Sequence, residues 1–370
     1  MNREDLLDDV LSIQQNNILL ELATGIGKSR LAIEKLKQLT DNKGKLLIVV
    51  NRVVHKQVWM DEINKWWSNC QMDITLTTYV SLHKYIGSYD AAIFDEIQHL
   101  SERCQLLIPA FNIKYSILCS ATVPKNIRWA INTLFYPLYT YRKSLRTTID
   151  DGILPDPEVY FIPLDLNNVS PIETYKHKYK GTIKCTQQAK YNLLTNDCEY
   201  WKQRYMRNTT DILKNKWLFA CNQRLKWLGQ IKTPLVLKIL EIISDHRSLT
   251  FCTDIEQTKA LGDYCINSKN KSSMDILEQF NNGLINHITA CNMLNEGVNL
   301  VNCQVGIYAN LNASKVITKQ RLGRLLRHSQ PIIIIPYYRN TRDEELIKKM
   351  REDYNPQKIH IISNIKEINL

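Results

Sequence analysis

The sequence lacks the features that mark membrane and secreted proteins. No apolar run among its 370 residues reaches the roughly 18 to 20 residues that a membrane span needs. The first ten residues, MNREDLLDDV, are acidic and polar, whereas a secretory leader is basic and then apolar. We therefore expect a cytoplasmic protein with no membrane partner. Its Asn-, Ile- and Lys-rich composition suggests a bacterial cell or a phage-infected host.

Residue patterns for zinc, redox and covalent chemistry are also missing. None of the ten cysteines belongs to a C-x-x-C pair, which is the usual sign of a zinc or redox site. Cys119, Cys252 and Cys291 lie in apolar runs and are expected to be small buried residues of strands. No Ser-His-Asp or Cys-His arrangement points to a covalent nucleophile.

Positive charge, by contrast, is concentrated in one part of the chain. Residues 171–240 carry 14 Lys and Arg against 4 Asp and Glu, which accounts for nearly all of the net charge of +11. Aromatic residues are interleaved with these cations, so the segment is suited to binding a nucleic acid. The alternative is a solvated helical segment whose aromatics face its own core. The candidate contact residues are Lys202, Arg204, Arg207, Lys214 and Lys216.

Short apolar runs alternate with amphipathic stretches, as is typical of parallel sheets covered by helices on both faces. The pattern occurs twice, so we expect two α/β lobes, at 1–144 and 233–370, with a mainly helical basic insertion at 145–232. The expected strands are 17–22, 45–51, 73–78, 91–94 and 115–120 in the first lobe and 248–252, 288–291, 304–308 and 331–336 in the second. The expected helices are 28–39, 53–67, 255–264, 315–327 and 342–351.

The strand at 17–22 leads directly into a loop that contains glycines and then into a helix. Gly25 and Gly27 allow backbone N–H groups to turn toward a phosphate, and the helix N-terminus adds a positive dipole. Lys28 would reach phosphate oxygens, and Ser29 offers a hydroxyl to Mg²⁺. The sequence therefore predicts a phosphate-binding loop made of Thr24, Gly25, Ile26, Gly27, Lys28 and Ser29.

Two further groups of residues suit phosphoryl chemistry. Asp95 and Glu96 follow an apolar strand, where they would hold Mg²⁺ and activate the attacking water; a solvated strand end is the alternative. Arg321, Arg324 and Arg327 share one face of an expected helix. Guanidinium groups in such a row can neutralise a transferring phosphoryl group, although a basic surface helix would show the same spacing.

The order of these motifs resembles that of the superfamily-two helicases. Residues 23–29 are similar to motif I of that family, 95–98 to its DExH or DExQ motif II, and 120–122 to its S-A-T motif III. Motifs Ia, Ib, IV, V and VI have counterparts at 46–59, 77–82, 248–253, 295–300 and 320–327. The resemblance implies two RecA-like P-loop NTPase lobes and a nucleic-acid-stimulated ATPase that uses ATP and Mg²⁺.

The resemblance also implies a role for individual residues. Glu96 would be the catalytic base, Lys28 a phosphate ligand, and Asp95 with Ser29 the holders of Mg²⁺. Gln320 would contact ATP, and Arg324 and Arg327 would act as arginine fingers. Residues that couple ATP to movement would be Gln98, Ser120, Ala121, Thr122 and Gly297, with Gln98 and Gln320 cross-linking the lobes. Nucleic-acid phosphates would be contacted by Arg52, Thr78 and Thr253.

Motif VI reads Q-R-L-G-R-L-L-R and motif II ends in Gln98. Both resemble DNA-directed members of the XPB, UvsW and restriction-translocase branch more than DEAD-box RNA helicases. We therefore expect a monomeric DNA helicase or translocase with protein partners in replication, recombination or repair. The alternatives are an RNA helicase and an ATP-switched DNA clamp or remodelling factor that does not separate strands. No R-x-x-Q adenine-reading motif precedes residue 23, and Gln14 and Gln15 are candidate substitutes.

Overall fold

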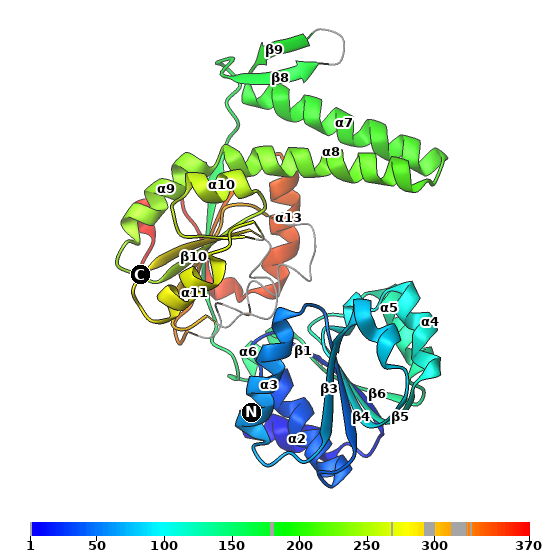
Figure 1. Cartoon of the computed structure of the whole chain (residues 1–370). Coiled ribbons are helices and arrows are strands. Elements are labelled where there is room, and N and C mark those ends of the chain that lie inside the picture. Colours follow the sequence, from blue (N-terminus) through cyan, green and yellow to red (C-terminus); the bar gives the residue numbers. More distant parts are fainter. Residues whose placement is uncertain are drawn as a thin grey trace. The chain divides into compact units, whose positions relative to one another are not determined.

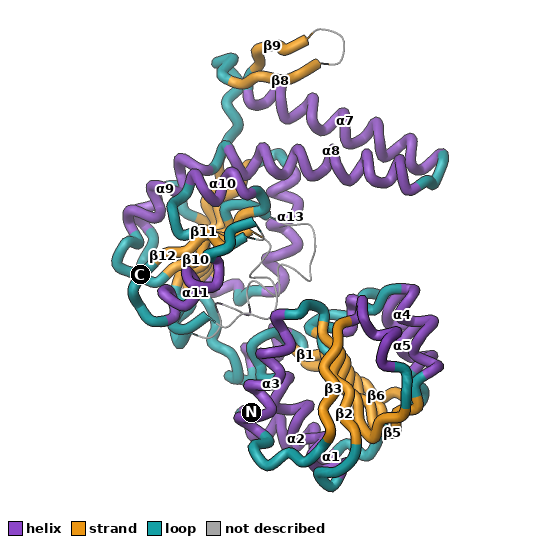
Figure 2. The backbone as a smooth tube through the Cα atoms, in the orientation of Figure 1, coloured by secondary structure: helices purple, strands orange, loops and turns teal. Residues whose placement is uncertain are grey.

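The chain is described by a computed structural model that covers residues 2–177, 181–267, 269–291, 300–311, 323, 325 and 328–370. It contains two compact units, one at Met1–Pro155 and the other at Asp156–Leu294, which continues through His328–Leu370. Each unit is built on a parallel sheet with helices beside it, as Figure 1 and Figure 2 show. The predicted fold class, two α/β lobes, is confirmed.

The first lobe holds a six-stranded parallel sheet in the order β3-β2-β4-β5-β1-β6. Its strands are β1 (Asn17–Leu22), β2 (Lys45–Val50), β3 (Asp73–Thr78), β4 (Ser88–Phe94), β5 (Asn112–Ser120) and β6 (Leu138–Lys143). Its helices are α1 (Arg3–Ser12), α2 (Lys28–Thr40), α3 (Val54–Trp66), α4 (Glu102–Leu107), α5 (Lys125–Leu134) and α6 (Leu145–Asp150).

Alternate strand residues of this sheet face opposite sides, as the two-residue period of a strand requires. Ile18 and Leu20 belong to a core with α1, α2 and α3, whereas Leu19 belongs to a second core with α4 and α5. Because both faces are covered, each strand reads as a continuous apolar run. The carboxyl ends of the strands all lie at one edge, so the residues that follow β1 and β4 come together there.

The second lobe holds a seven-stranded parallel sheet in the order β11-β12-β10-β13-β14-β7-β15. Its strands are β7 (Glu158–Leu164), β10 (Ser248–Cys252), β11 (Cys265–Ile266), β12 (His287–Cys291), β13 (Val305–Tyr308), β14 (Ile332–Tyr338) and β15 (Ile359–Ile361). Its helices are α9 (Thr233–Ile242), α10 (Ile255–Ala260), α11 (Ser273–Asn281) and α13 (Arg342–Met350).

The position of β7 differs from the expected domain boundaries. The sequence pattern predicts that 145–232 belongs to the insertion, yet β7 lies inside the second sheet, between β14 and β15. Its four residues from Val159 to Ile162 are all buried and pair with the apolar run of β14. The Pro155-Asp156-Pro157 turn is therefore the start of the second lobe, and the insertion proper begins after Leu164.

The insertion forms a projection that we call the arm. It consists of an antiparallel hairpin, β8 (Glu173–His177) and β9 (Gly181–Cys185), and two long helices, α7 (Gln187–Arg207) and α8 (Asp211–Gln230). Figure 1 shows α7 and α8 running side by side beyond the sheet of the second lobe. The base of α8 is fixed to that lobe, because Gln257 Nε2 donates to the Gly229 carbonyl at 2.6 Å and Asn310 Nδ2 to the Leu225 carbonyl at 3.0 Å.

Three further predictions concern the end of α10, the helix expected at 315–327, and the residues Gln14 and Gln15. Helix α10 ends at Ala260 instead of Tyr264, because Gly262 at φ +149° interrupts the helical path. The helix expected at 315–327 falls mostly outside the described residues. Gln14 and Gln15 precede β1, whereas the phosphate loop follows its opposite end. Their role in reading adenine stays a prediction.

Candidate active site

The phosphate loop lies between β1 and α2, in the local geometry that its sequence predicts. Gly25 has φ +91° and Gly27 has φ +100°, a left-handed conformation that favours glycine. Gly27 is the N-cap of α2, and no side chain accepts a hydrogen bond there. The first N–H groups of α2 are therefore available to an anion, where the helix dipole also favours negative charge. Ile26 is buried and anchors the loop in the core.

Lys28 and Thr24 are the polar side chains of this loop that could bind a phosphate. The Lys28 Nζ donates to the carbonyl oxygens of Leu22 at 3.1 Å and Ala23 at 3.4 Å, so the ammonium lies inside its own loop. The buried hydroxyl of Thr24 has no hydrogen-bond partner in the part of the chain that the structure describes. A buried polar atom without a partner is costly, and a bound phosphate would satisfy it.

Asp95 lies at the carboxyl end of β4 in a largely apolar setting. Its Oδ2 accepts a hydrogen bond from Trp59 Nε1 at 2.9 Å, and its carbonyl oxygen accepts one from Tyr79 Oη at 2.9 Å. Burial, reinforced by the neighbouring Glu96 carboxylate, raises the pKa of Asp95 to about 7, while Trp59 and Lys28 act in the opposite direction. A cation would offset this crowding of negative charge, and hydroxyl and carboxylate oxygens such as those of Ser29 and Asp95 suit Mg²⁺.

Glu96 adopts an unusual backbone conformation. Its φ of 49° and ψ of 54° are left-handed, which costs free energy for a residue other than glycine. Its Oε2 accepts a hydrogen bond from Gln98 Nε2 at 2.5 Å. This side chain is therefore held in place by the chain, unlike that of a freely solvated strand end.

A chain of hydrogen bonds continues from Gln98 to motif III. Ser120 Oγ donates to Gln98 Oε1 at 2.6 Å, and Thr122 N donates back to Ser120 Oγ at 3.1 Å. The Thr122 hydroxyl donates to the Ala121 carbonyl at 2.7 Å. Both ends of the Gln98 amide are thus engaged within the first lobe. Its expected role of linking the two lobes stays a prediction.

Several predicted site residues fall outside the described part of the chain. These are the ATP contact, the two arginine fingers and one coupling residue, namely Gln320, Arg324, Arg327 and Gly297. Their roles stay predictions from the motif resemblance.

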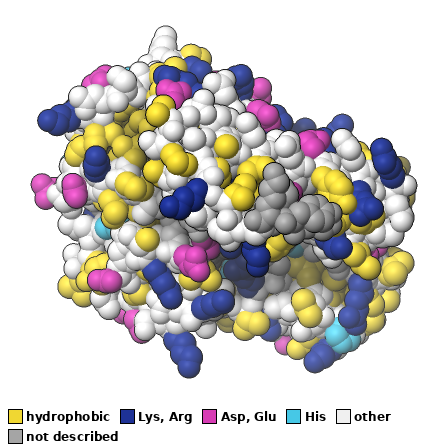
Figure 3. Space-filling view, turned by 90° about the horizontal axis from the view of Figure 1, so that it is seen from above, with side chains coloured by type: hydrophobic (Ala, Val, Ile, Leu, Met, Phe, Trp, Pro, Cys, Tyr) yellow, Lys and Arg dark blue, Asp and Glu magenta, His cyan; other side chains and the backbone are white. Residues whose placement is uncertain are grey.

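The five predicted arm cations come together at one end of the arm, which we call the arm tip (residues 202–216). The last turns of α7 carry Lys202, Arg204 and Arg207, and the first turns of α8 carry Lys214 and Lys216. Four of these five residues are exposed and Lys202 is partly exposed. Figure 3 shows that Lys and Arg side chains on the face seen from above are spread among uncharged, hydrophobic and acidic ones. The exposed cations of the arm tip can therefore contact a polyanion.

Several aromatic residues of the arm pack within it, whereas Tyr200 and Phe219 are 49% and 65% exposed. The rings of Tyr205 on α7 and Trp217 on α8 stack with centroids 5.8 Å apart, and Lys216 Nζ lies 4.8 Å from the centre of the Trp201 ring. Trp227 is buried and donates to Glu173 on β8 at 3.2 Å. For these rings the structure favours the packing alternative over stacking on bases.

The three predicted phosphate contacts in other motifs differ in their exposure. Arg52 is exposed just before α3. Thr78 is only 7% exposed at the end of β3, so its side chain offers little surface to a nucleic acid. Thr253 follows β10, and its hydroxyl accepts a hydrogen bond from Asn310 Nδ2 at 2.5 Å.

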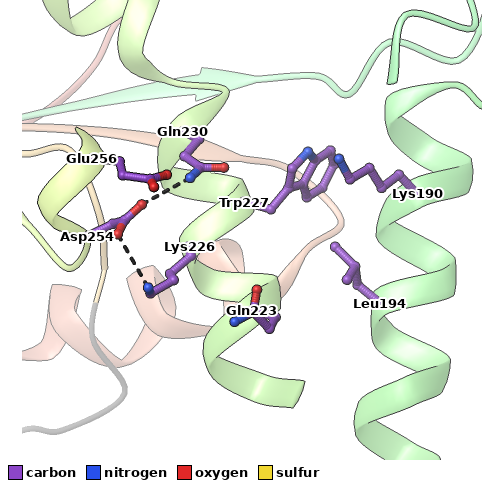
Figure 4. A pocket seen from close by; sticks show the side chains of 8 residues that line it. All are labelled: Lys190, Leu194, Gln223, Lys226, Trp227, Gln230, Asp254 and Glu256. Atoms are coloured by element: carbon purple, nitrogen blue, oxygen red, sulfur yellow. Dashed lines mark hydrogen bonds and ion pairs between the residues drawn. The ribbon is translucent and has the colours of Figure 1, made fainter. Parts of the chain in front are cut away.

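Next to Thr253, a cavity of about 270 Å³ lies between helices α7 and α8 of the arm and the segment that follows β10. Figure 4 shows Lys190 and Leu194 on one wall and Asp254 and Glu256 on the opposite side. The buried carboxylate of Asp254 accepts a hydrogen bond from Gln230 Nε2 at 3.0 Å and pairs with the Lys226 ammonium at 3.3 Å. The sequence does not predict this cavity, because its walls come from segments far apart in the chain.

Two negative findings apply to the described residues alone. They contain no group of three or more His, Cys, Asp or Glu side chains arranged to hold a metal ion. None of the helices described has the length and apolar character needed to cross a membrane.

Known proteins with similar sequences share both lobes. Residues 4–125 match the family described as "Type III restriction enzyme, res subunit", and residues 232–329 match "Helicase conserved C-terminal domain". The "DNA 3'-5' translocase XPB2" of Sulfurisphaera tokodaii is 23% identical over 368 residues, which cover 92% of this chain and 82% of that protein.

Solved structures share the fold at lower identity. The Pyrococcus furiosus Hef helicase domain has a TM-score of 0.56 and 13% identity, covering 94% of this chain and 97% of its own. S. cerevisiae Dbp5 bound to RNA and ADP BeF3 has a TM-score of 0.63 and 10% identity, covering 97% and 88%. Both support the assignment of the two lobes to the RecA-like fold.

Proposed function

Because the chain belongs to the superfamily-two helicases and translocases, nucleic-acid-dependent enzymes that use ATP, we propose that it couples ATP hydrolysis to movement on DNA or to its unwinding. The observation that carries this proposal is the convergence of two groups at one sheet edge. Lys28 follows β1, and Asp95 with Glu96 follows β4, two strands that both pair with β5. This convergence supports the proposed roles of Lys28 as a phosphate ligand, Asp95 as a metal ligand and Glu96 as the base.

In the proposed reaction, these side chains bind and orient the reactants. Lys28 and the N–H groups of α2 bind the phosphates of ATP. Ser29 and Asp95 would hold Mg²⁺, which when bound neutralises charge on the β- and γ-phosphates. Glu96 accepts a hydrogen bond from the attacking water and takes up its proton, while Gln98 fixes the orientation of the Glu96 carboxylate.

Several observations support DNA as the nucleic acid. The motif VI pattern resembles DNA-directed members, and the relative from Sulfurisphaera tokodaii is named a DNA translocase. The arm tip and the exposed Arg52 supply positive charge for the sugar-phosphate backbone. The likeness to the RNA-bound Dbp5 concerns the fold, so it does not favour RNA.

We further propose a monomeric motor that works in the cytoplasm of a bacterial cell or a phage-infected host, with protein partners in replication, recombination or repair. The composition of the chain and the branch that its motifs resemble support this setting.

The proposal is tested by steady-state ATPase activity without nucleic acid and with single-stranded DNA, duplex DNA or RNA, at one fixed low salt concentration. Lys28→Ala serves as the blank, because it removes the phosphate ligand. Stronger stimulation by DNA than by RNA is the expected result. Stronger stimulation by RNA would select the RNA helicase alternative. Stimulation by duplex DNA without strand separation in a fluorescent unwinding assay would select a translocase or an ATP-switched clamp.

A further inference from the structure

Glu21 is a carboxylate inside β1, between the apolar residues Leu20 and Leu22. It is only 7% exposed in β1, where it aligns with Ser120 of β5 on one side and Arg142 of β6 on the other. A buried charge at such a place is costly unless it is paired and hydrogen-bonded. It lies three residues before Thr24 of the phosphate loop, and the motif pattern assigns it no role.

Among the described residues, the Glu21 carboxylate has three hydrogen-bond partners, all in the first lobe. Oε1 accepts hydrogen bonds from Arg128 Nη2 at 2.6 Å and from the backbone N–H of Val123 at 3.1 Å. Oε2 accepts one from Arg142 Nε at 2.6 Å. Burial alone would raise the pKa of Glu21, but the hydrogen bonds from Arg128, Val123 and Arg142 outweigh it, so the pKa is lowered. Glu21 is therefore ionised, and protein hydrogen-bond donors take the place of the water that would otherwise solvate its carboxylate.

Val123 connects the Glu21 carboxylate to motif III. It follows Ser120-Ala121-Thr122 directly, so Glu21 holds one end of the motif III turn. Arg128 Nη2 also donates to the Val123 carbonyl at 3.3 Å, which holds the same end from a second side. The other end is held by Ser120 Oγ, whose bond to Gln98 leads to Glu96.

The turn at 120–123 is thus fixed between the strand of the phosphate loop and the side chain of the catalytic base. We infer that Glu21 is a positioning residue that sets the geometry of this turn and thereby couples nucleic-acid binding to ATP turnover. Replacing it by a neutral group leaves the partly buried guanidinium group of Arg128 and the exposed one of Arg142 without this counter-ion and releases one end of the turn. The inference rests on the proposed function, because coupling requires a nucleic-acid-stimulated ATPase.

The test compares Glu21→Gln, Glu21→Asp and wild type. For Glu21→Gln we expect at least a tenfold loss of kcat with saturating DNA and a change in the KM for ATP of less than twofold. Glu21→Asp keeps the charge and should restore part of the rate. Glu158→Gln is the matched control, since Glu158 is a strand carboxylate of the second lobe that is paired with two basic side chains, Lys358 and His360, and lies outside the arm. An equal loss of kcat in this control would reduce the role of Glu21 to general stability and overturn the inference.

A double variant identifies the route of the effect. Ser120→Ala releases the other end of the turn, so Glu21→Gln and Ser120→Ala together should cost much less than the product of the two separate losses. Multiplicative losses would show two independent effects and contradict the inference. If Glu21→Gln does not fold, Arg142→Gln replaces it, because that side chain is 57% exposed and its loss leaves Arg128 in place. A two- to fivefold loss of stimulated kcat is then expected, and an unchanged kcat overturns the inference.

The wild-type measurement separates this inference from the proposed function. A wild type that no nucleic acid stimulates contradicts the proposed function and the inference together. A stimulated wild type with a normal Glu21→Gln variant contradicts the inference alone.

Discussion

Lys232 and Asp343 form an ion pair at 2.6 Å in which neither side chain is exposed to solvent. Lys232 precedes α9, at the junction between the arm and the second lobe, and Asp343 lies in the first turn of α13. Asp343 Oδ2 also accepts a hydrogen bond from the backbone N–H of Tyr338. The pair therefore ties the base of the arm to the end of the sheet.

Breaking this pair should be strongly destabilising. Asp343→Asn or Lys232→Met alone is expected to cost about 3 to 5 kcal/mol in the free energy of unfolding, because each leaves a buried charge without its partner. The double variant Lys232→Met with Asp343→Leu should cost clearly less than either single change. Urea unfolding measures the stability of all three variants, and a double variant at least as unstable as the single variants would contradict this expectation.

Glu96→Gln should separate ATP binding from hydrolysis. The amide keeps the size of the side chain but cannot take up a proton, so kcat should fall about 10² to 10⁴-fold. Binding of a fluorescent ATP analogue should stay within about threefold of wild type, since Glu96 does not lie in the phosphate loop. Normal turnover in this variant would remove Glu96 from the catalytic role.

Arg324→Ala and Arg327→Ala test the arginine-finger prediction, which stands on the sequence motif. Loss of a finger is expected to lower kcat by about 10³-fold or more. Arg321→Ala, on the same expected helix face, is the comparison. Wild-type rates in both Arg324→Ala and Arg327→Ala would refute the prediction.

Charge reversal at the arm tip should weaken DNA binding. Replacement of Lys202, Arg204, Arg207, Lys214 and Lys216 by glutamate is expected to raise Kd at low salt at least tenfold. The slope of log Kd against log salt should decrease by about 0.7 to 0.9 for each DNA phosphate that the arm tip no longer neutralises. Lys348→Glu with Lys349→Glu, two exposed cations on α13, is the control. An unchanged slope would leave the arm tip as a solvated surface.

Because of His287, we expect the second lobe to become less stable in acid. Burial lowers the pKa of its imidazole from 6.5 to about 4, against the opposing hydrogen bond with Ser248. The unfolded chain therefore binds a proton below pH 6.5 that the folded chain resists until about pH 4, so stability falls as pH decreases through this window. From pH 7.5 to 5 the expected loss is about 2 kcal/mol.

The control for this effect is His287→Gln, which cannot titrate. Its unfolding free energy in urea should change less between pH 7.5 and 5 than that of wild type. Parallel pH profiles for the two proteins would show that other groups cause the acid sensitivity.

The parts of the site that sequence could predict are those determined locally. Gly27 and Lys28 follow a buried strand at once, and Asp95 and Glu96 end another, so the strand and loop order is enough to place them. The partners of Glu21 could not be found this way, because Val123 and Arg142 are more than 100 residues distant and meet it only through the order of strands in the sheet. A glutamate within an apolar run was the one available signal.

The arm shows the same limit. Its charge is visible in composition, but composition cannot tell whether Trp217 faces a ligand or Tyr205 on the neighbouring helix. Likewise, the apolar run of β7 reads as part of a connection until its pairing with β14 is known.

The attachment of α8 at Gly229 has a mechanical consequence. The 21 residues of α7 give the arm a length of about 30 Å at about 1.5 Å per residue. Because the base is fixed to the second lobe at Gly229 and Leu225, the arm must turn with that lobe as a lever. A rotation of roughly 10° would carry the tip through about 5 Å, which exceeds the roughly 3.4 Å spacing of nucleotides along one DNA strand. Small angular changes in the lobe thus become displacements of about one nucleotide at the arm tip.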